Sequence, residues 1–307
     1  MKTDLDHLPP SKQRELARVV EIIHEEFADA MKLATSKKRK DGRILKIVLF
    51  GSYARGGWVD EPHTAKGYLS DYDLLIVVNQ ERLLDFSDYW YKAEDRLITE
   101  PAIKTPVNFI VHTLSEVNEK LQQGQYFFRD VVRDGIALYD LKGSKAFAQP
   151  QPLTAVEALE TAKKYYDQWI PSAARRLEAF QFEMSKAAEN ENWHKDAAFT
   201  LHQAVERYYA GILLVLTNYS PSSHNVKFLR SLAEDLDARL IDVWPRETKH
   251  DRRCFELLKR AYVEARYSEH YKITEDELAW LGARAEALQG AVEEICAERL
   301  TALAEQI

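Results

Sequence analysis

The chain has 307 residues, of which 46% are hydrophobic and 30% are charged, and its formal net charge is −7. This length allows two domains that each bury a core, and the composition excludes a disordered chain. The negative charge argues against a protein that coats nucleic acid through bulk electrostatics. The apolar stretches are too short to span a bilayer and the start MKTDLDHLPP lacks an apolar signal core, so we expect a cytoplasmic protein with no membrane partner.

The first half of the chain mixes helix and strand patterns. From Ser11 to Leu33, apolar residues recur every three or four positions, which predicts an amphipathic helix. Residues 44–50, 72–78 and 107–112 are short apolar runs, rich in β-branched residues and bounded by Gly, Asp or Pro. These runs predict strands of one buried sheet. A helix is expected at residues 88–98, between the second and third strands.

The second half is predicted to be helical throughout. It follows the segment AFAQPQPLTA, whose two prolines and small polar residues are typical of a linker. Beyond this segment, helices are expected near residues 153–188, 193–217, 226–236, 247–269 and 274–305. The predicted fold class is therefore α+β, with a mixed domain at residues 1–147 and an all-α bundle at residues 148–307.

The segment FGSYAR at the end of the first strand has the features of a triphosphate-binding turn. Gly51 allows the backbone to approach a phosphate closely, and Ser52 offers a hydroxyl and an N–H group. The residues that follow can open a helix, whose N-terminus favours anions. Arg55 lies one turn further along and can reach the same phosphates.

Two aspartates begin the second strand. Asp71 and Asp73 are two residues apart, so strand alternation puts both carboxylates on one face while Tyr72 points away. Such a pair can hold magnesium ions, which neutralise charge as pyrophosphate leaves a nucleoside triphosphate. The pair alone could be a turn before a core strand, but the Gly-Ser pair on the preceding strand favours a metal site.

LFGSYARG followed by SDYDLLIVV resembles the nucleotidyltransferase superfamily related to DNA polymerase beta, in the branch of minimal nucleotidyltransferases and kanamycin nucleotidyltransferase. The resemblance implies a nucleotidyltransferase fold with a short mixed sheet. It also implies that Gly51 and Ser52 bind the triphosphate and that Asp71 and Asp73 hold Mg²⁺. The insert GWVDEPHTAKGYL is expected to form a loop at the mouth of the site.

The third strand, TPVNFIVHT, has an amide where the superfamily has a third carboxylate. Asn108 takes this position and shares its strand face with His112. An amide oxygen can bind Mg²⁺ weakly, but it adds no charge and cannot act as a base. We therefore expect Asn108 to help bind one nucleotide-bound magnesium. Substitute bases could come from Glu94, Asp95 or Glu100.

WHKDAAFTLHQAVERYYAGILLVLTNYSPSSHNVKFLRSLA resembles the HEPN domain, a helical bundle found beside such nucleotidyltransferases in prokaryotes. The resemblance implies a homodimer through these helices and, as in some members, ribonuclease activity that uses an Arg and a His a few residues apart. The nearest match is Arg266 and His270, which would share one helical face if the helix continued through His270. The alternative is an exposed polar pair at a helix end. Paired systems of this kind also suggest the adjacent Tyr271 as an acceptor of AMP.

Three functions remain open from the sequence. The first is a magnesium-dependent nucleotidyltransferase that moves a nucleoside monophosphate, expected to be AMP from ATP, onto a hydroxyl of a small molecule, a protein or an RNA. The second is a nucleotide-sensing module whose chemistry is lost at Asn108. The third is a ribonuclease that acts on RNA and is restrained by the first half, as in toxin–antitoxin pairs.

Overall fold

The computed structural model describes residues 1–32, 41–58, 70–187, 190, 192–221 and 223–307. Described residues up to Pro152 form one compact unit, and residues from Leu153 onward form a second. The first unit contains helices and a sheet, and the second contains helices, so the predicted α+β fold class is confirmed. The predicted domain bounds, which place the division between residues 147 and 148, stay a prediction. The insert before Ser70 lies outside the described residues, apart from its start at Gly57 and Trp58.

The first unit contains the following elements in chain order: α1 (Pro10–Lys32), β1 (Ile44–Phe50), α3 (Gly51–Arg55), β2 (Tyr72–Val78), the 3₁₀ helix η1 (Glu81–Leu84), α4 (Phe86–Tyr89), α5 (Tyr91–Thr99), β3 (Val107–Thr113), α6 (Leu114–Gln122), α7 (Tyr126–Asp134) and β4 (Ile136–Asp140). The first helix and the three predicted strands end within one residue of their expected positions. The sequence patterns give no separate indication of α6, α7 and β4.

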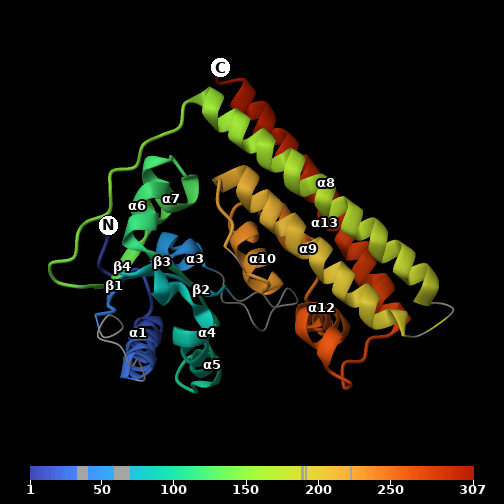
Figure 1. Ribbon diagram of the computed structural model, residues 1–307, viewed down its shortest axis with the longest axis horizontal. Coiled ribbons are helices and arrows are strands. Elements are labelled where there is room, and N and C mark those ends of the chain that lie inside the picture. Colours follow the sequence, from blue (N-terminus) through green and yellow to red (C-terminus); the bar gives the residue numbers. More distant parts are fainter. Residues whose placement is uncertain (33–40, 59–69, 188–189, 191, 222) are drawn as a thin grey trace. The chain divides into compact units, whose positions relative to one another are not determined.

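The four strands form a mixed sheet in the order β3-β2-β1-β4. Strand β1 is antiparallel to β2 and β4, whereas β2 and β3 are parallel. Helices α1, α4 and α5 lie on one side of the sheet, and α6 and α7 lie on the other (Figure 1). Because β1 and β2 are central and covered on both sides, both strands are buried almost throughout.

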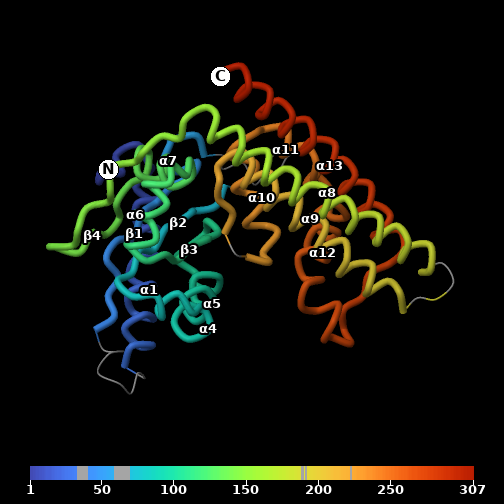
Figure 2. The backbone as a smooth tube through the Cα atoms, turned by 45° about the horizontal axis from the view of Figure 1, so that its top comes forward, coloured from blue at the N-terminus to red at the C-terminus, as the bar shows by residue number. Residues whose placement is uncertain are grey.

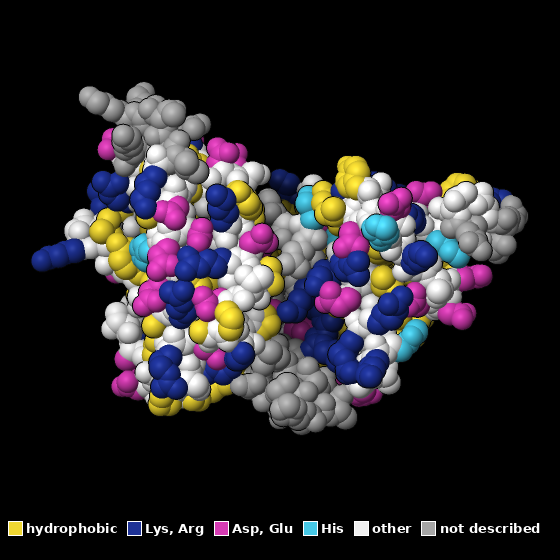
Figure 3. Space-filling view, turned by 90° about the horizontal axis from the view of Figure 1, so that it is seen from below, with side chains coloured by type: hydrophobic (Ala, Val, Ile, Leu, Met, Phe, Trp, Pro, Cys, Tyr) yellow, Lys and Arg dark blue, Asp and Glu magenta, His cyan; other side chains and the backbone are white. Residues whose placement is uncertain are grey.

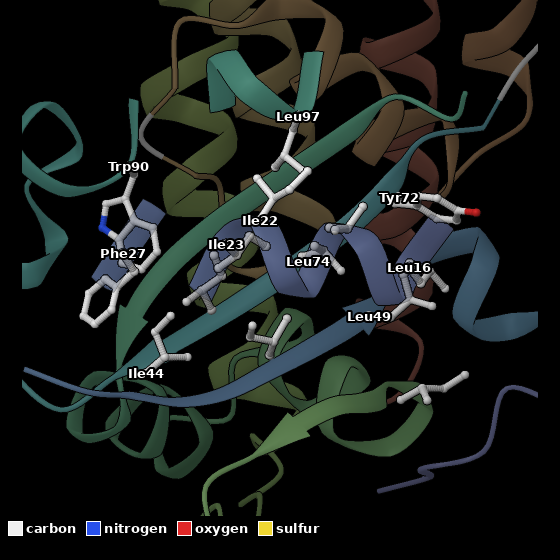
Figure 4. Packing of buried hydrophobic residues seen from close by; sticks show 14 of the residues in the cluster. Leu16, Ile22, Ile23, Phe27, Ile44, Leu49, Tyr72, Leu74, Trp90 and Leu97 are labelled. Carbon is white, nitrogen blue, oxygen red and sulfur yellow. The ribbon is translucent and has the colours of Figure 1, made fainter. Parts of the chain in front are cut away.

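The core between α1 and the sheet explains why α1 is amphipathic. One face of α1 packs against alternate residues of β1 and β2, with Phe27 stacked on Trp90 at 5.3 Å between ring centroids (Figure 4). Besides Phe27 and Trp90, the labelled side chains of this core are Leu16, Ile22, Ile23, Ile44, Leu49, Tyr72, Leu74 and Leu97. The opposite faces of β1 and β2 are thereby left for α6, α7 and the polar residues described below. On the face of this unit that the left half of Figure 3 shows, basic and acidic side chains are interspersed.

The second unit consists of α8 (Ala155–Ala187), α9 (Trp193–Thr217), α10 (Val226–Glu234), α11 (Arg239–Asp242), α12 (Lys249–Tyr267) and α13 (Glu275–Ala304). The long helices α8, α9 and α13 pack side by side, and α10 and α12 pack against α9 (Figures 1 and 2). All five predicted helices end within two residues of their expected positions. Among the described residues, no helix combines the length and apolar character needed to cross a membrane.

Candidate functional site

The Gly-Ser turn is the start of the short helix α3, which directly follows β1. Gly51 has a φ of 75°, in the left-handed region that glycine adopts without a steric cost. Helix α3 ends at Gly56, also left-handed, whose N–H donates to the carbonyl oxygen of Ser52. Ser52 is buried, with 8% of its surface exposed. The chain therefore passes from β1 directly into a short helix through a left-handed glycine, as expected for a segment that places backbone N–H groups near a ligand.

Strand register brings this turn close to the aspartates. Phe50, the last residue of β1, pairs with Asp73 on β2, and Asp73 pairs with Asn108 on β3. Gly51 directly follows Phe50. The turn, the Asp pair and the amide thus belong to adjoining ends of three neighbouring strands.

The two aspartates and Asn108 face one another. The side-chain Nδ2 of Asn108 donates to Asp71 Oδ2 at 3.0 Å and to Asp73 Oδ1 at 3.4 Å. Asp71 and Asp73 are 4% and 2% exposed, while Tyr72 between them points to the α1 side of the sheet. Two buried carboxylates that share one amide donor repel each other, so the site is electrostatically suited to a cation.

The donor set fits a magnesium ion that is mainly held by its nucleotide. The described residues contain no group of three or more His, Cys, Asp and Glu side chains arranged to hold a metal. A cation beside Asp71 and Asp73 would therefore have two protein carboxylates as ligands. Mg²⁺ commonly binds through one or two carboxylates and completes its shell with phosphate oxygens and water. For Asn108 to add an amide oxygen, its side chain must turn over, because Nδ2 now faces the carboxylates.

Arg55 lies at the exposed end of α3 and interacts electrostatically with α7. Burial raises the pKa of the Asp130 carboxyl, and the hydrogen bond from Arg133 lowers that of Asp134, while the Arg55 charge makes a smaller contribution that favours the ionised form of both. Helix α7 also packs against the end of β1, because the Phe127 ring lies 5.3 Å from the Phe50 ring between centroids. Asp130 is thus a carboxyl near the turn to which the sequence analysis assigned no role.

His112, which shares the strand face of Asn108, and the suggested substitute bases have other partners. His112 Nδ1 lies 2.9 Å from Glu116 Oε2, and this hydrogen bond lowers the pKa of Glu116. Glu100 accepts hydrogen bonds from Arg18 on α1. Helix α5, which carries Glu94 and Asp95, packs on α1, on the side of the sheet opposite Asn108. None of these contacts places a base beside the Asp pair.

In the second unit, Arg266 and His270 do not share a helical face. Helix α12 ends at Tyr267, and the His270 side chain beyond it is 89% exposed. Arg266 Nε donates to the carbonyl oxygen of Tyr262 at 2.7 Å. Its guanidinium lies 4.6 Å from the ring centroid of Tyr262 and 4.7 Å from that of Phe199. The condition under which the pair was expected to act together is therefore not met.

Tyr271 is buried, contrary to the role of an accessible acceptor. Only 1% of its surface is exposed, and its hydroxyl donates to the carbonyl oxygen of Leu257 at 3.0 Å. Burial raises the pKa of this phenol. By contrast, Tyr267 is 75% exposed. In this fold the Tyr271 hydroxyl is a structural donor rather than a surface nucleophile.

The structure groups a different set of polar residues near Arg266. His224 Nδ1 lies 2.9 Å from Glu206 Oε2, and its ring stacks on Tyr262 at 4.0 Å between centroids. His202, one turn before Glu206 on α9, is fully buried, and burial lowers its pKa to about 4. The i, i+4 spacing of His202 and Glu206 in HQAVERYY is the only sequence signal for this group.

Comparisons with known proteins agree with both halves of this description. Residues 30–138 match the family model of the nucleotidyltransferase domain, and residues 166–295 match that of the HEPN domain. A protein of Methanocaldococcus jannaschii, named as an inferred protein adenylyltransferase, is 37% identical over 115 residues, which are 38% of this chain and 93% of that protein.

Among solved structures, a nucleotidyltransferase-like protein from Exiguobacterium sibiricum 255-15 matches over 88% of this chain and 74% of its own. Its identity is 10% and its TM-score is 0.26. The two domain matches and the relative matched over nearly its whole length show the family. The chain belongs to the nucleotidyltransferase family, and it is a transferase that carries a HEPN domain after its nucleotidyltransferase domain.

Proposed function

We propose that the chain transfers AMP from magnesium-bound ATP to a hydroxyl group of a protein. The observation that carries this proposal is the convergence of Asp71, Asp73 and Asn108 beside the turn at Gly51. The name of the Methanocaldococcus jannaschii relative supports AMP as the transferred group and a protein as the acceptor. A small-molecule or RNA hydroxyl, the other acceptors expected from sequence, has no comparable support.

Each site residue has a role in this proposal. Asp71 and Asp73 hold the cation, and Asn108 orients their carboxylates through its two hydrogen bonds. A bound Mg²⁺ would offset the charge of the triphosphate and of the pyrophosphate product. The backbone at Gly51 and the hydroxyl of Ser52 contact phosphate oxygens. Arg55 supplies a further positive charge near the leaving group.

In the reaction, the acceptor oxygen forms a bond to the α-phosphorus of ATP as the bond from that phosphorus to the pyrophosphate oxygen breaks. The acceptor hydroxyl loses its proton, and pyrophosphate leaves. Asn108 cannot take this proton, because a side-chain amide does not act as a base near neutral pH. A carboxylate oxygen of the Asp pair or a solvent molecule must accept it, so we expect slow turnover that increases with pH.

Calorimetry and a pyrophosphate-release assay test the proposal. We expect Asp71→Asn and Asp73→Asn each to weaken magnesium-dependent ATP binding by about 1–3 kcal/mol, the scale of a lost charged contact. Asp95→Asn is a matched control, because it removes the same charge from an exposed position on α5, across the sheet from the site. Unchanged affinity in both site variants would reject the assignment.

A nucleotide-sensing module is the second candidate, and the amide at Asn108 favours it. Such a protein would bind magnesium-ATP with the same dependence on Asp71 and Asp73. It would release no pyrophosphate above the level of Asp71→Asn, and mass spectrometry would find no AMP adduct. These two measurements separate sensing from transfer without knowledge of the physiological acceptor.

The predicted ribonuclease activity and homodimer are separate proposals about the helical unit. The separation of Arg266 and His270 by a helix end gives the ribonuclease little support. RNA cleavage by the full chain that is lost in Arg266→Ala but kept in Asp71→Asn would establish it. Sedimentation velocity of the full chain at several concentrations tests the homodimer.

A further inference from the structure

A buried polar network lies beneath the site, on the α1 side of the sheet. Lys12 and Glu15, near the start of α1, are only 8% and 9% exposed. Lys12 Nζ donates to Thr105 Oγ1 at 2.7 Å, and the Thr105 backbone N–H donates to Glu15 Oε2 at 3.3 Å. The Tyr72 hydroxyl donates to the same Glu15 oxygen at 3.4 Å. Lys and Glu are seldom buried to this degree unless they are paired or hydrogen-bonded, as they are here.

This network reaches both strands that carry the proposed metal ligands. Tyr72 lies between Asp71 and Asp73, and Figure 4 shows it on the same side of the sheet as Leu16 of α1. Thr105 lies three residues before Asn108, and the Tyr72 N–H donates to the carbonyl oxygen of Pro106 at 2.8 Å. The entry to β3 and the start of β2 are thus both bound to the side chain of Glu15, and the Lys12 side chain adds a second bond to the entry to β3.

The network also reaches the Gly-Ser turn. Tyr53 directly follows Ser52 and is fully buried. Its ring lies 4.5 Å from that of Tyr72, and the Lys12 ammonium lies 5.8 Å from its centroid. Lys12 therefore contacts residues from two of the three segments that form the site, and Glu15 contacts the third.

We propose that Lys12, Glu15, Tyr72 and Thr105 are positioning residues, which hold the ends of β2 and β3 so that Asp71, Asp73 and Asn108 face one point. The physical reason is strand alternation. Rotation of β2 about its axis would move Tyr72, Asp71 and Asp73 together. Hydrogen bonds that hold the Tyr72 phenol on the α1 side of the sheet therefore also fix the direction of both carboxylates on the other side. Metal ligands must be held to about 0.5 Å, and supporting hydrogen bonds commonly provide this precision.

The inference rests on the proposed function, since it assigns these residues a role in magnesium-ATP binding. This positioning role differs from a purely structural one. A residue that only stabilises the fold would not alter how the affinity for ATP, bound on the other side of the sheet, depends on Mg²⁺.

The test uses two variants of the full chain that remove one hydroxyl each, Tyr72→Phe and Thr105→Val. Thr113→Val is the matched control. Thr113 is also a buried threonine and is the last residue of β3, at the end of the strand opposite Thr105, and its Oγ1 accepts a hydrogen bond from the Glu116 N–H at 3.1 Å. Calorimetry measures the ATP affinity with Mg²⁺ and with EDTA, and thermal unfolding measures stability.

We expect Tyr72→Phe and Thr105→Val to weaken ATP binding in Mg²⁺ by about 10-fold or more, the scale seen when supporting partners of metal ligands are removed. Binding in EDTA should change much less. Thr113→Val should lower the melting temperature while keeping the wild-type affinity.

Wild-type affinity in both test variants would overturn the inference and leave the proposed function intact. An equal loss in all three variants would also overturn it, because the effect would then follow stability alone. Wild-type protein that binds no ATP in Mg²⁺ would instead overturn the proposed function, and the inference with it.

Discussion

Asn108→Asp changes the interaction between the two aspartates most directly. The amide donor lies 3.0 Å from Asp71 Oδ2 and 3.4 Å from Asp73 Oδ1, and the variant replaces it with a third carboxylate. A hydrogen bond to a charged group contributes about 1.5–3 kcal/mol. The longer of the two contacts is near the limit for a hydrogen bond, so we take the combined loss as about 3 kcal/mol. Repulsion among three carboxylates adds to this loss until one of them binds a proton.

Without metal, this loss should lower the melting temperature of the first unit by roughly 6–12 °C, since 1 kcal/mol corresponds to about 2–4 °C in a domain of this size. Saturating Mg²⁺ should reverse much of the effect, because the third carboxylate becomes a ligand instead of a repelling charge. A ligand at 100 times its dissociation constant adds about 2.7 kcal/mol of stability. Mg²⁺ should therefore stabilise the variant more than the wild type.

The assay is thermal unfolding in EDTA and in Mg²⁺, combined with pyrophosphate release from ATP. Asn118→Asp is the control, because Asn118 on α6 uses its side-chain oxygen to accept from the Ala148 N–H at 2.7 Å, and a carboxylate keeps that acceptor. If Asn108→Asp is as stable as wild type in EDTA, or if Mg²⁺ stabilises both proteins equally, Asn108 does not face the Asp pair. A folded variant with no gain in pyrophosphate release would show that the missing carboxylate does not limit turnover.

Three further outcomes are expected. Burial holds the pKa of His202 near 4, against 6.5 for an ordinary histidine. As the pH falls below 6.5, His202 therefore binds a proton in the unfolded chain but not in the native chain. Stability should drop by about 2 kcal/mol between about pH 7 and pH 5, and His202→Leu should flatten this slope in urea titrations. Tyr271→Phe should cost about 1 kcal/mol. In the native protein, acetylimidazole should label Tyr267 and leave Tyr271 unmodified. Incubation with magnesium-ATP should also leave Tyr271 unmodified, and an AMP adduct on Tyr271 would contradict its burial. Gly51→Ala should lower the free energy of unfolding by about 1–2 kcal/mol because of the positive φ at this position, and it should weaken ATP binding. Gly57→Ala should change neither stability nor ATP affinity, because its Cβ would have no neighbour within 4 Å.

The sequence predicted the strands and the arrangement of their polar residues because both depend on local periodicity. Strands β1 and β2 are buried on both faces, so their apolar runs are continuous and their ends are sharp. Alternation alone was enough to place Asp71 and Asp73 on one face, and the third strand added Asn108 to it. The helical pattern of the second half was equally local.

Elements and contacts without a strong local pattern could not be predicted. Strand β4 has five residues and only its first is buried, and α6 and α7 have nine residues each. The contacts of His224 with Glu206 and Tyr262 join residues far apart in the chain. Tyr271 is buried, and its hydroxyl donates to the Leu257 carbonyl oxygen in the preceding helix, fourteen residues earlier. Nothing in ARYSEHY distinguishes its buried tyrosine from its exposed one.

The parallel pairing of β2 with β3 has a consequence for the order of folding. The two strands are joined by a crossover that contains η1, α4 and α5, so their contact closes a long loop, which is slow compared with local pairing. Asn108 reaches the Asp pair only after this closure. Nucleotide affinity should therefore develop late during refolding, after α1 has formed. In the native protein, detachment of β3 alone would abolish binding without global unfolding, and bound nucleotide should slow amide hydrogen exchange in β3 more than in α1.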